Sequence, residues 1–367
     1  MDYMKQALTL AGLALGQVSP NPAVGAVVVK DGVVVGKGHT QPPGGDHAEV
    51  VALKQAGTQA KDGVIYVTLE PCNIYGRTPP CTKAIIEAGI KEVNIAMIDG
   101  NPQVNGDGIK ELKDADIEVK LGEGEKEARR LNEAYIHYKK TGKPFVIAKY
   151  AISLDGKIAT KKGDSKWISS QDSRCSAHQL RHITDVIMVG INTVLMDNPQ
   201  LTVRGGHGKG GNAEKQPLRI IVDSCGRTPL EANVFHEPGK TIIAVANKIT
   251  KKKKKAYRDV GAEVIEIPAA DGRVDLTKLL DYLGEKSVTS ILVEGGGILL
   301  GSLFDLKLVD KVIAYIAPMI IGGEEAKSPV AGEGFATIAE AVKLKDLSVN
   351  TCDDDVIITG YPVKKDV

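Results

Sequence analysis

The sequence His47-Ala48-Glu49, followed by Pro71-Cys72 and then by Cys81, decides how the first part of the chain is interpreted. Imidazole and thiolate are ligands that Zn²⁺ prefers, and a catalytic zinc site keeps three protein ligands with a fourth position open to water. We therefore predict a catalytic zinc site whose ligands are His47, Cys72 and Cys81. Glu49 is expected to lie beside the ion without binding it, where a carboxylate can move the proton of a water that the ion has acidified.

Two other interpretations of these residues remain open. The three ligands could form a closed structural site, or they could be three buried residues that never meet. A structural zinc usually has a fourth Cys or His ligand, and His39 is the only local candidate. His39 could instead line the substrate pocket. Asn21, which lies between two prolines ahead of a predicted strand, could hydrogen-bond the edge of a pyrimidine.

The motif His-x-Glu with Pro-Cys-x-x-Cys is the signature of zinc-dependent base deaminases. This chain differs from the signature in one respect, because eight residues, 73–80, separate Cys72 from Cys81. The inserted segment contains Arg77, whose guanidinium could bind a phosphate on the substrate. The pattern therefore indicates hydrolytic deamination at a zinc ion.

Length and charge exclude several classes of protein. At roughly 150 residues per domain, 367 residues predict about two domains. The 47 basic and 46 acidic side chains leave a net charge of +1, which excludes non-specific binding to nucleic acid or to an anionic membrane. No apolar run approaches the ~18 residues of a membrane span, and no signal peptide is expected. Five scattered cysteines suit a reducing compartment, so we expect a cytoplasmic protein.

Hydrophobic patterning predicts an α/β fold for the first part of the chain. Short β-rich runs alternate with amphipathic stretches, and Asp31-Gly32 between two valine-rich runs favours a tight hairpin turn. The later strands are expected to be parallel. The predicted strands are 24–30, 32–36, 64–68, 93–97 and 117–121.

A polar run containing Gly142 and Pro144 follows a charged helical stretch, 123–140, and is the best candidate for a linker. We place the domain boundary there, which gives domains 1–142 and 143–367. A second α/β series follows the boundary. Its predicted strands are 145–152, 186–190, 219–223, 241–246, 263–267, 290–294, 311–317 and 356–360.

The sequence Glu294-Gly295-Gly296-Gly297 lies between a predicted strand and an apolar run, and such a strand–glycine–helix junction can cradle a pyrophosphate. The glycine spacing does not fit the dinucleotide fingerprint, and no acidic residue follows at about twenty positions, so a Rossmann domain is disfavoured. From these residues alone, a structural turn and a phosphate site stay equally open.

The motifs of both halves together resemble those of the bifunctional riboflavin-biosynthesis deaminase–reductase family. The resemblance covers almost the whole chain, and finding both sets of motifs in this order is what makes it specific. The motifs are residues 19–25, 47–50, 69–72 and 76–81 in the first half, and residues 153–159, 167–168, 190–195, 197–199, 201–204 and 293–297 in the second half.

This resemblance implies an N-terminal cytidine-deaminase-like three-layer domain and a C-terminal dihydrofolate-reductase-like domain. It implies zinc-dependent deamination of 2,5-diamino-6-(5-phosphoribosylamino)pyrimidin-4-one to 5-amino-6-(5-phosphoribosylamino)uracil. An NADPH-dependent reduction of the ribosyl group to a ribityl group would follow. It also implies a small-molecule substrate, no nucleic acid or membrane partner, and a homo-oligomer that associates through the reductase domain.

Carry-over onto matching positions implies the residues of the reductase site. Lys149 is expected to assist proton transfer during opening of the ribosyl ring. Arg181 and Arg204 suit a phosphate, because a guanidinium grips its oxygens in a fork. The NADP site would be lined by Ala151, Trp167, Thr193, Asp197, Ser224, Gly296 and Gly297, in a stretch that continues to Ser302. The substrate of the reductase would be held by Ser165, Arg181, Leu201, Arg204 and Glu294.

One position departs from the family, which usually carries a histidine where this chain has Ile74. A reductase with an impaired deaminase domain is therefore an alternative. Two further alternatives are a deaminase that acts on nucleic acid, which would need a basic groove and stacking aromatic side chains, and a metal-stabilised scaffold without activity. The net charge of +1 and 4% aromatic residues argue against the first, and Glu49 beside a three-ligand site argues against the second.

Overall fold

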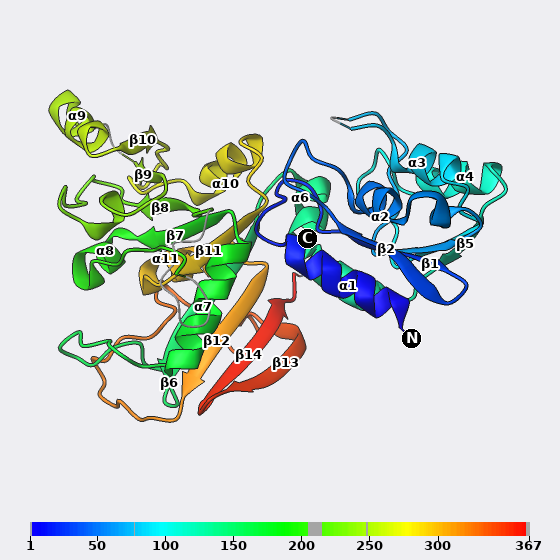
Figure 1. Ribbon diagram of the computed structural model, residues 1–367. Helices are drawn as coiled ribbons and strands as arrows, with labels where there is room; N and C mark the ends of the chain where they lie inside the picture. Colours follow the sequence, from blue (N-terminus) through cyan, green and yellow to red (C-terminus); the bar gives the residue numbers. More distant parts are fainter. Residues whose placement is uncertain (1, 77, 205–214, 247–248, 365–367) are drawn as a thin grey trace. The chain divides into compact units, whose positions relative to one another are not determined.

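The computed structural model describes residues 2–76, 78–204, 215–246 and 249–364 (Figure 1). The chain divides into two compact units, Met1–Lys143 and Pro144–Val367. No helix within the described ranges is long and apolar enough to cross a lipid bilayer.

The first unit contains a five-stranded sheet in the order β2-β1-β3-β4-β5. Strand β1 pairs with β2 and β3 in antiparallel fashion, whereas β3, β4 and β5 are parallel, as predicted for the later strands. The predicted hairpin turn is present, because Asp31 and Gly32 have φ values of 50° and 77°, which a primed turn requires. The strands are β1 (Gly25–Lys30), β2 (Val33–His39), β3 (Val64–Val67), β4 (Glu92–Ile95) and β5 (Glu118–Leu121).

Helices cover both faces of this sheet. A Cβ at Gly25 would lie 1.9 Å from the backbone oxygen of Ala7 in α1, and a Cβ at Gly38 would lie 2.2 Å from that of Ala48 in α2. Gly38 pairs with the residue that follows Gly25, so the two glycines face opposite sides and admit one helix each. The result is the three-layer domain that was predicted. The helices are α1 (Tyr3–Ala14), α2 (Ala48–Ala56), η1 (Gly57–Ala60), α3 (Cys81–Glu87), α4 (Asp107–Asp114), α5 (Glu125–Leu131) and α6 (Glu133–Thr141).

The helical stretch predicted over 123–140 is present as two helices, α5 (Glu125–Leu131) and α6 (Glu133–Thr141), which Asn132 separates. Asn132 is buried and has φ −108° and ψ 17°. Its side-chain oxygen accepts a hydrogen bond from the Ala23 backbone N–H at 2.8 Å, and its Nδ2 donates to the Ala23 carbonyl at 3.0 Å. This tertiary contact fixes the segment ahead of β1 and interrupts the helix, which local patterning does not reveal.

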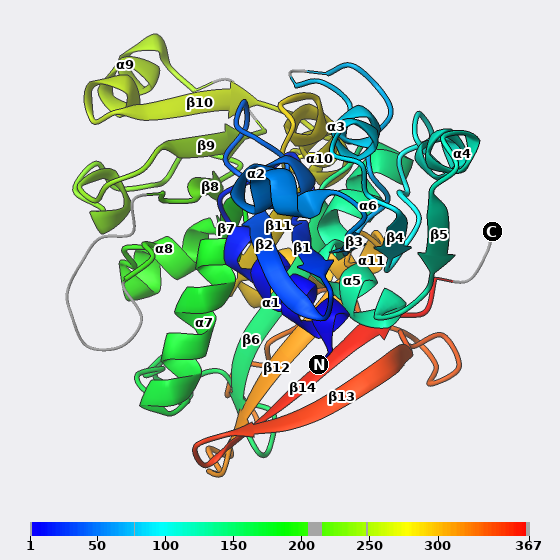
Figure 2. The same ribbon diagram turned by 45° about the vertical axis from the view of Figure 1, so that its right-hand side comes forward.

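The second unit contains a nine-stranded sheet in the order β10-β9-β8-β7-β11-β6-β12-β14-β13. The strands from β10 to β12 are parallel, and β14 and β13 are added in antiparallel fashion. Figure 2 shows the β13–β14 hairpin at one edge of this sheet and β10 at the other. The strands are β6 (Phe145–Ser153), β7 (Val186–Gly190), β8 (Leu218–Val222), β9 (Thr241–Val245), β10 (Ala262–Glu266), β11 (Ser290–Glu294), β12 (Lys311–Ala317), β13 (Leu344–Cys352) and β14 (Asp355–Pro362).

Buried aliphatic side chains of the central strands pack against leucines of α10 and α11, and this layer forms the core of the second unit. Strand β13 is absent from the predicted set. It is an outer strand whose side chains are mostly exposed, so it lacks the alternating burial that reveals a strand in sequence. The helices are α7 (Gln171–Ile183), α8 (Ile191–Asp197), η2 (Asn233–Phe235), α9 (Lys251–Asp259), α10 (Leu276–Glu285) and α11 (Gly297–Asp305).

Candidate active sites

The three predicted zinc ligands meet at one point in the first unit. His47 caps α2, Cys81 begins α3, and Cys72 lies in the loop between β3 and α3. The Nδ1 atom of His47 is 3.2 Å from the Cys81 Sγ and 3.5 Å from the Cys72 Sγ, and the three ligand atoms lie within 4.8 Å of one another. Tetrahedral zinc with bonds of ~2.0–2.3 Å separates its ligand atoms by about 3.5 Å. The donor set and its spacing therefore fit Zn²⁺.

The electrostatics of the ligands also suit a metal cation. A hydrogen bond from Cys81, helped by one from His47, outweighs burial and lowers the pKa of the Cys72 thiol to about 4. The hydrogen bond to Cys72 and burial raise the pKa of the Cys81 thiol. Because zinc binds thiolates, its binding displaces the proton that Cys81 retains.

Glu49 lies in the first turn of α2, two positions after the ligand His47, and is 4% exposed. Burial, followed by the negative charge of Cys72, raises the pKa of Glu49 to about 7, although His47 opposes the shift. A carboxyl group with a pKa near neutrality can both take up and return a proton. Glu49 therefore has the position and the acidity of a proton shuttle beside the three candidate zinc ligands.

Two further residues support this site, and neither was identified from the sequence. The Thr78 hydroxyl is 3.4 Å from Nε2 of His47, on the side of the ring that faces away from the thiols. The buried Glu70 carboxylate accepts backbone hydrogen bonds from Asp99, Gly106, Gly108 and Ile109 at 3.0–3.2 Å. Glu70 thus ties the start of α4 to the chain immediately before Pro71-Cys72, and only its position in that motif hinted at a role.

The other residues predicted for this site are Asn21, His39 and Arg77. Asn21 lies in the loop before β1 and His39 ends β2, and no hydrogen bond joins either side chain to the zinc ligands in the described part of the chain. Arg77 lies outside the described residues. Ile74 is 36% exposed, so the position that usually carries a histidine in the family borders solvent.

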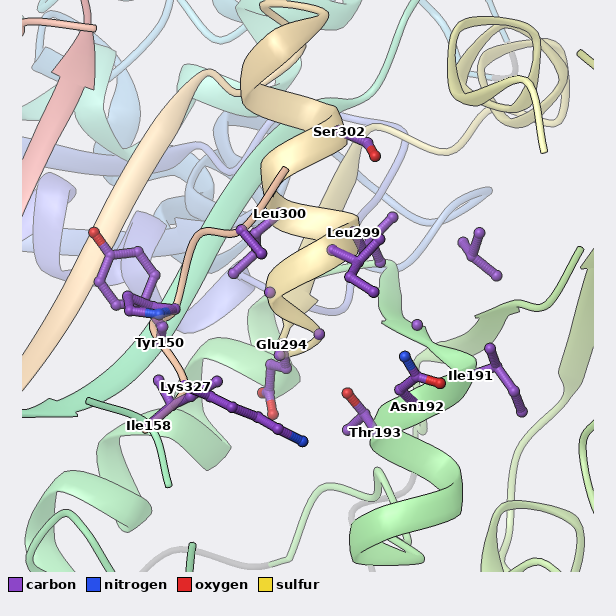
Figure 3. Close-up of a pocket in the computed structure, with 18 of the residues that line it drawn as sticks. Tyr150, Ile158, Ile191, Asn192, Thr193, Glu294, Leu299, Leu300, Ser302 and Lys327 are labelled. Atoms are coloured by element: carbon purple, nitrogen blue, oxygen red, sulfur yellow. The ribbon is translucent and has the colours of Figure 1, made fainter. Parts of the chain in front are cut away.

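The second unit holds a large pocket at the carboxyl ends of its parallel strands. Its volume is about 1480 Å³, larger than the ~300–1,000 Å³ of a typical ligand pocket, which leaves room for a dinucleotide and a second substrate. Figure 3 shows Glu294 at the end of β11 and Asn192 and Thr193 at the start of α8 pointing into it. The predicted residues that line it are Lys149, Ala151, Ser165, Arg181, Thr193, Asp197, Leu201, Ser224, Glu294, Gly296 and Gly297.

Two predicted residues do not line this pocket. Trp167 is 68% exposed, and the Arg174 guanidinium lies 4.6 Å from the centre of its ring. Arg204 is exposed, and its backbone N–H donates to Nδ1 of His178 at 3.4 Å.

A charged cluster occupies one end of the pocket. Arg181 donates to both carboxylate oxygens of Glu294, at 2.8 and 2.6 Å, and to the Thr202 carbonyl at 3.0 Å, so all three of its nitrogens bond to protein groups. Burial opposes ionisation of Glu294, but the charge and hydrogen bonds of Arg181 outweigh it and lower the pKa of Glu294 to about 2. Burial lowers the pKa of Lys149, whose ammonium lies 5.0 Å from the centre of the Tyr315 ring. A lysine with a lowered pKa is a better proton donor than a solvated one.

The glycine junction between β11 and α11 forms the middle of the pocket. Gly295 and Gly296 have φ values of 78° and 85°, and a Cβ at Gly296 would lie 3.4 Å from the backbone nitrogen of Gly190 and from Oγ1 of Thr193. Because these glycines lack side chains, the start of α8 approaches the start of α11 closely at the pocket, and a helix N-terminus at such a junction can hold a phosphate group. This cradle fits the pyrophosphate of NADPH. Gly297 instead gives room to the Ser328 carbonyl, 3.0 Å from where its Cβ would lie.

Comparisons with known proteins agree with both sites. The family model described as RibD C-terminal domain matches residues 144–358, and the model of the cytidine and deoxycytidylate deaminase zinc-binding region matches residues 1–97. The chain belongs to the RibD family. The riboflavin biosynthesis protein RibD of Actinobacillus pleuropneumoniae is 42% identical over 98% of this chain and 94% of its own length. The RibD of Escherichia coli is 38% identical over 97% of each chain.

Solved structures of the RibD family extend this similarity to three dimensions. Form 1 of Acinetobacter baumannii RibD superposes with a TM-score of 0.87 at 37% identity, covering 99% of this chain and 98% of that one. A Thermotoga maritima diaminohydroxyphosphoribosylaminopyrimidine deaminase/5-amino-6-(5-phosphoribosylamino)uracil reductase superposes with a TM-score of 0.85 at 35% identity, covering 98% of each chain. Both units therefore have the folds that the resemblance implied.

Proposed function

We propose that the first unit deaminates a phosphoribosylaminopyrimidine and that the second unit reduces the ribosyl group of the product. The chain is a bifunctional enzyme of riboflavin biosynthesis, a hydrolase and an oxidoreductase in one polypeptide. The observation that carries the assignment of residues is the convergence of His47, Cys72 and Cys81 beside a buried Glu49 in one unit, with Lys149 and Glu294 beside a glycine cradle in the other.

In the first unit, His47, Cys72 and Cys81 would hold Zn²⁺, which acidifies a water when bound. Glu49 takes a proton from that water and returns it to the departing amine. The C–N bond to the amine breaks, a C–O bond forms at the same carbon, and ammonia leaves. Thr78 orients the His47 ring through Nε2, and Glu70 holds the backbone that precedes Cys72.

In the second unit, the cradle at Gly295 and Gly296 would hold NADPH, which supplies a hydride. Lys149 donates a proton to the ring oxygen as the ribosyl ring opens, and the opened carbon is then free to accept the hydride. Glu294 keeps negative charge beside Lys149, since Arg181 holds it ionised. The products are a ribityl group and NADP⁺.

Two variants separate the steps. Glu49→Gln should abolish ammonia release but leave NADPH oxidation on already deaminated substrate, whereas Lys149→Met should do the reverse. A mixture of the two variants should restore the overall conversion if the intermediate exchanges through solvent. If Lys149→Met folds and oxidises NADPH at the wild-type rate, Lys149 has no part in the reduction.

We further propose that copies of the chain associate through the second unit and that the enzyme works in the cytoplasm. The outer strand β13 supports association, because Leu347 and Val349 on it are 59% and 65% exposed. The cysteines outside the proposed zinc site, Cys175, Cys225 and Cys352, are free thiols, which supports a reducing compartment. Light scattering of wild type and Leu347→Glu tests the first point, since the variant should have the lower mass.

A further inference from the structure

We propose that Tyr315 positions the ammonium of Lys149 in the reductase pocket through a cation–π contact with the face of its ring. The inference rests on the proposed function of Lys149 as proton donor. It concerns a residue that does not itself line the pocket and that no sequence motif pointed to.

The strand register brings the two side chains to one face of the sheet. Lys149 on β6 lies opposite Glu294 on β11 and opposite Ile313 on β12. Because side chains alternate along a strand, Tyr315, two residues after Ile313, faces the same side as Lys149. Helix α7 covers that side, since its Arg181 bonds to Glu294. Lys149 therefore lies between a carboxylate on one neighbouring strand and an aromatic ring on the other.

The ring of Tyr315 is held in place by the fold. Tyr315 is 2% exposed, and its hydroxyl is 3.0 Å from Oγ of Ser176 on α7. The Nζ atom of Lys149 lies over this ring, 5.0 Å from its centre. A ring face attracts a cation within ~6 Å, and the attraction is stronger where water is excluded. The buried ring is thus a fixed support for the ammonium.

The charged groups around Lys149 leave its ammonium without another direct partner. In the described part of the chain, its Nζ forms no hydrogen bond and no ion pair. Both carboxylate oxygens of Glu294 accept from Arg181 instead. Burial, helped by the charge of Arg181, lowers the pKa of His178 on α7 to about 4, so His178 is neutral at pH 7. Lys327, which also lines the pocket, carries the same charge as Lys149.

A ring face suits a proton donor at this position. Burial lowers the pKa of Lys149, and the charge of Glu294 opposes that effect. The ring of Tyr315 also favours the charged form, but it does not take up the proton. The three N–H groups of the ammonium stay available to the ring oxygen of the substrate. Tyr315 thus fixes the ammonium and keeps it protonated while its proton remains transferable.

Acetylation of Lys149 tests the contact without turnover. In the zinc-loaded full chain, the rate of acetylation by acetic anhydride is measured at a series of pH values by mass spectrometry of the peptide that contains Lys149, which gives the pKa of its ammonium. Tyr315→Leu should lower this pKa by about 0.5–1.5 pH units, the value of a cation–π contact. Tyr315→Phe keeps the ring and should titrate with wild type.

A fluorinated ring keeps the test decisive if the leucine variant does not fold. Trifluorophenylalanine at position 315 keeps the volume of the phenylalanine ring but weakens the negative charge of its face. The pKa of Lys149 should therefore be lower in this protein than in Tyr315→Phe.

Tyr361→Leu is the matched control. The Tyr361 ring on β14 of the same sheet lies 5.5 Å from the Lys311 ammonium, and Tyr361 does not line the pocket. Its replacement removes a contact of the same kind and should leave the pKa of Lys149 unchanged. If neither Tyr315→Leu nor the fluorinated ring lowers the pKa of Lys149, or if Tyr361→Leu lowers it as much, Tyr315 does not position the ammonium.

The pH profile of NADPH oxidation on deaminated substrate separates this inference from the proposed function. A proton donor must be protonated, so the rate falls above its pKa. The alkaline limb of the profile should move to lower pH in Tyr315→Leu by the same amount as the pKa of Lys149. If acetylation shows the lower pKa but the alkaline limb does not move, Lys149 is not the proton donor and the proposed function fails, whereas the contact with Tyr315 stands.

Discussion

Arg181 on α7 and Glu294 at the end of β11 are joined by two parallel hydrogen bonds, from Nε to Oε1 at 2.8 Å and from Nη2 to Oε2 at 2.6 Å. Both side chains are largely buried, with 15% and 10% of their surfaces exposed. The pair keeps a carboxylate ionised beside Lys149, where burial alone would favour its neutral form. Arg181 is therefore a positioning residue for Glu294, because all three of its nitrogens bond to protein groups, whereas the substrate contact that the resemblance implied stays a prediction.

Removing one member of this pair leaves an uncompensated buried charge. Arg181→Met should lower the free energy of unfolding by about 3–5 kcal/mol at pH 7. In wild type the pKa of Glu294, about 2, lies below the unfolded value of about 4.3, so its stabilising contribution is present above pH ~4 and is lost as the pH falls toward 2. In the variant, burial raises the pKa of Glu294 above the unfolded value. The loss of unfolding free energy relative to wild type should therefore be smaller at pH 5 than at pH 7.

Urea unfolding of wild type and Arg181→Met at both pH values checks this prediction. An equal loss of unfolding free energy at the two pH values would contradict it. The double variant Arg181→Met with Glu294→Gln should recover stability.

Replacement of Glu70 should affect the stability and the reaction of the first unit only. In Glu70→Gln an amide N–H₂ replaces an oxygen that accepts backbone N–H groups, so at least one buried donor loses its partner, at a cost of about 1–3 kcal/mol. Ammonia release should fall, whereas NADPH oxidation on deaminated substrate should not change. Glu87→Gln, an exposed residue of α3, is the control and should change neither quantity. If Glu70→Gln has the free energy of unfolding and the rate of ammonia release of wild type, the anchoring role assigned to Glu70 is wrong.

Replacement of Thr78 should change the affinity for zinc more than the stability of the fold. Partners of the second ring nitrogen of a ligating histidine typically contribute 10- to 100-fold to metal affinity. Thr78→Val should therefore weaken zinc binding about 10- to 100-fold in a competition with a chelator, and Thr78→Ser should restore it, because the serine keeps the hydroxyl near Nε2 of His47. Equal affinities of wild type and Thr78→Val would show that the 3.4 Å contact does not orient the ligand.

Ile74 stands where the family usually has a histidine, and it borders solvent. Ile74→His should raise kcat/KM for deamination about tenfold, the value of one added polar contact to the substrate. Ile74→Ala, which removes the apolar side chain without adding a polar group, should give no such gain. If the histidine variant deaminates no faster than wild type, this position does not limit the first reaction.

The zinc site could be predicted from the sequence because its ligands are residue types with few other uses at that spacing. His47, Cys72 and Cys81 meet as expected, with Glu49 beside them. The contacts around them could not be predicted in the same way. Thr78 and Glu70 lie within motifs of the family, but their roles depend on the ring nitrogen and the backbone amides that the folded chain brings to them.

In the second unit, too, some features could be predicted from the sequence and others could not. The strands of the central sheet were predicted because they are buried on both faces and read as apolar runs, whereas the exposed edge strand β13 was not. The glycine junction was identified from its place between a predicted strand and an apolar run, and the role of Glu294 was implied by the family resemblance.

Zinc content and ammonia release, measured together in wild type and in Glu49→Gln, test the role of the first unit most directly. The carboxylate of Glu49 is not a ligand, so both proteins should bind one zinc per chain, and only wild type should release ammonia from the pyrimidine substrate. NADPH oxidation on deaminated substrate should be the same in both. If Glu49→Gln releases ammonia at the wild-type rate with its zinc in place, Glu49 does not transfer the proton in the deamination.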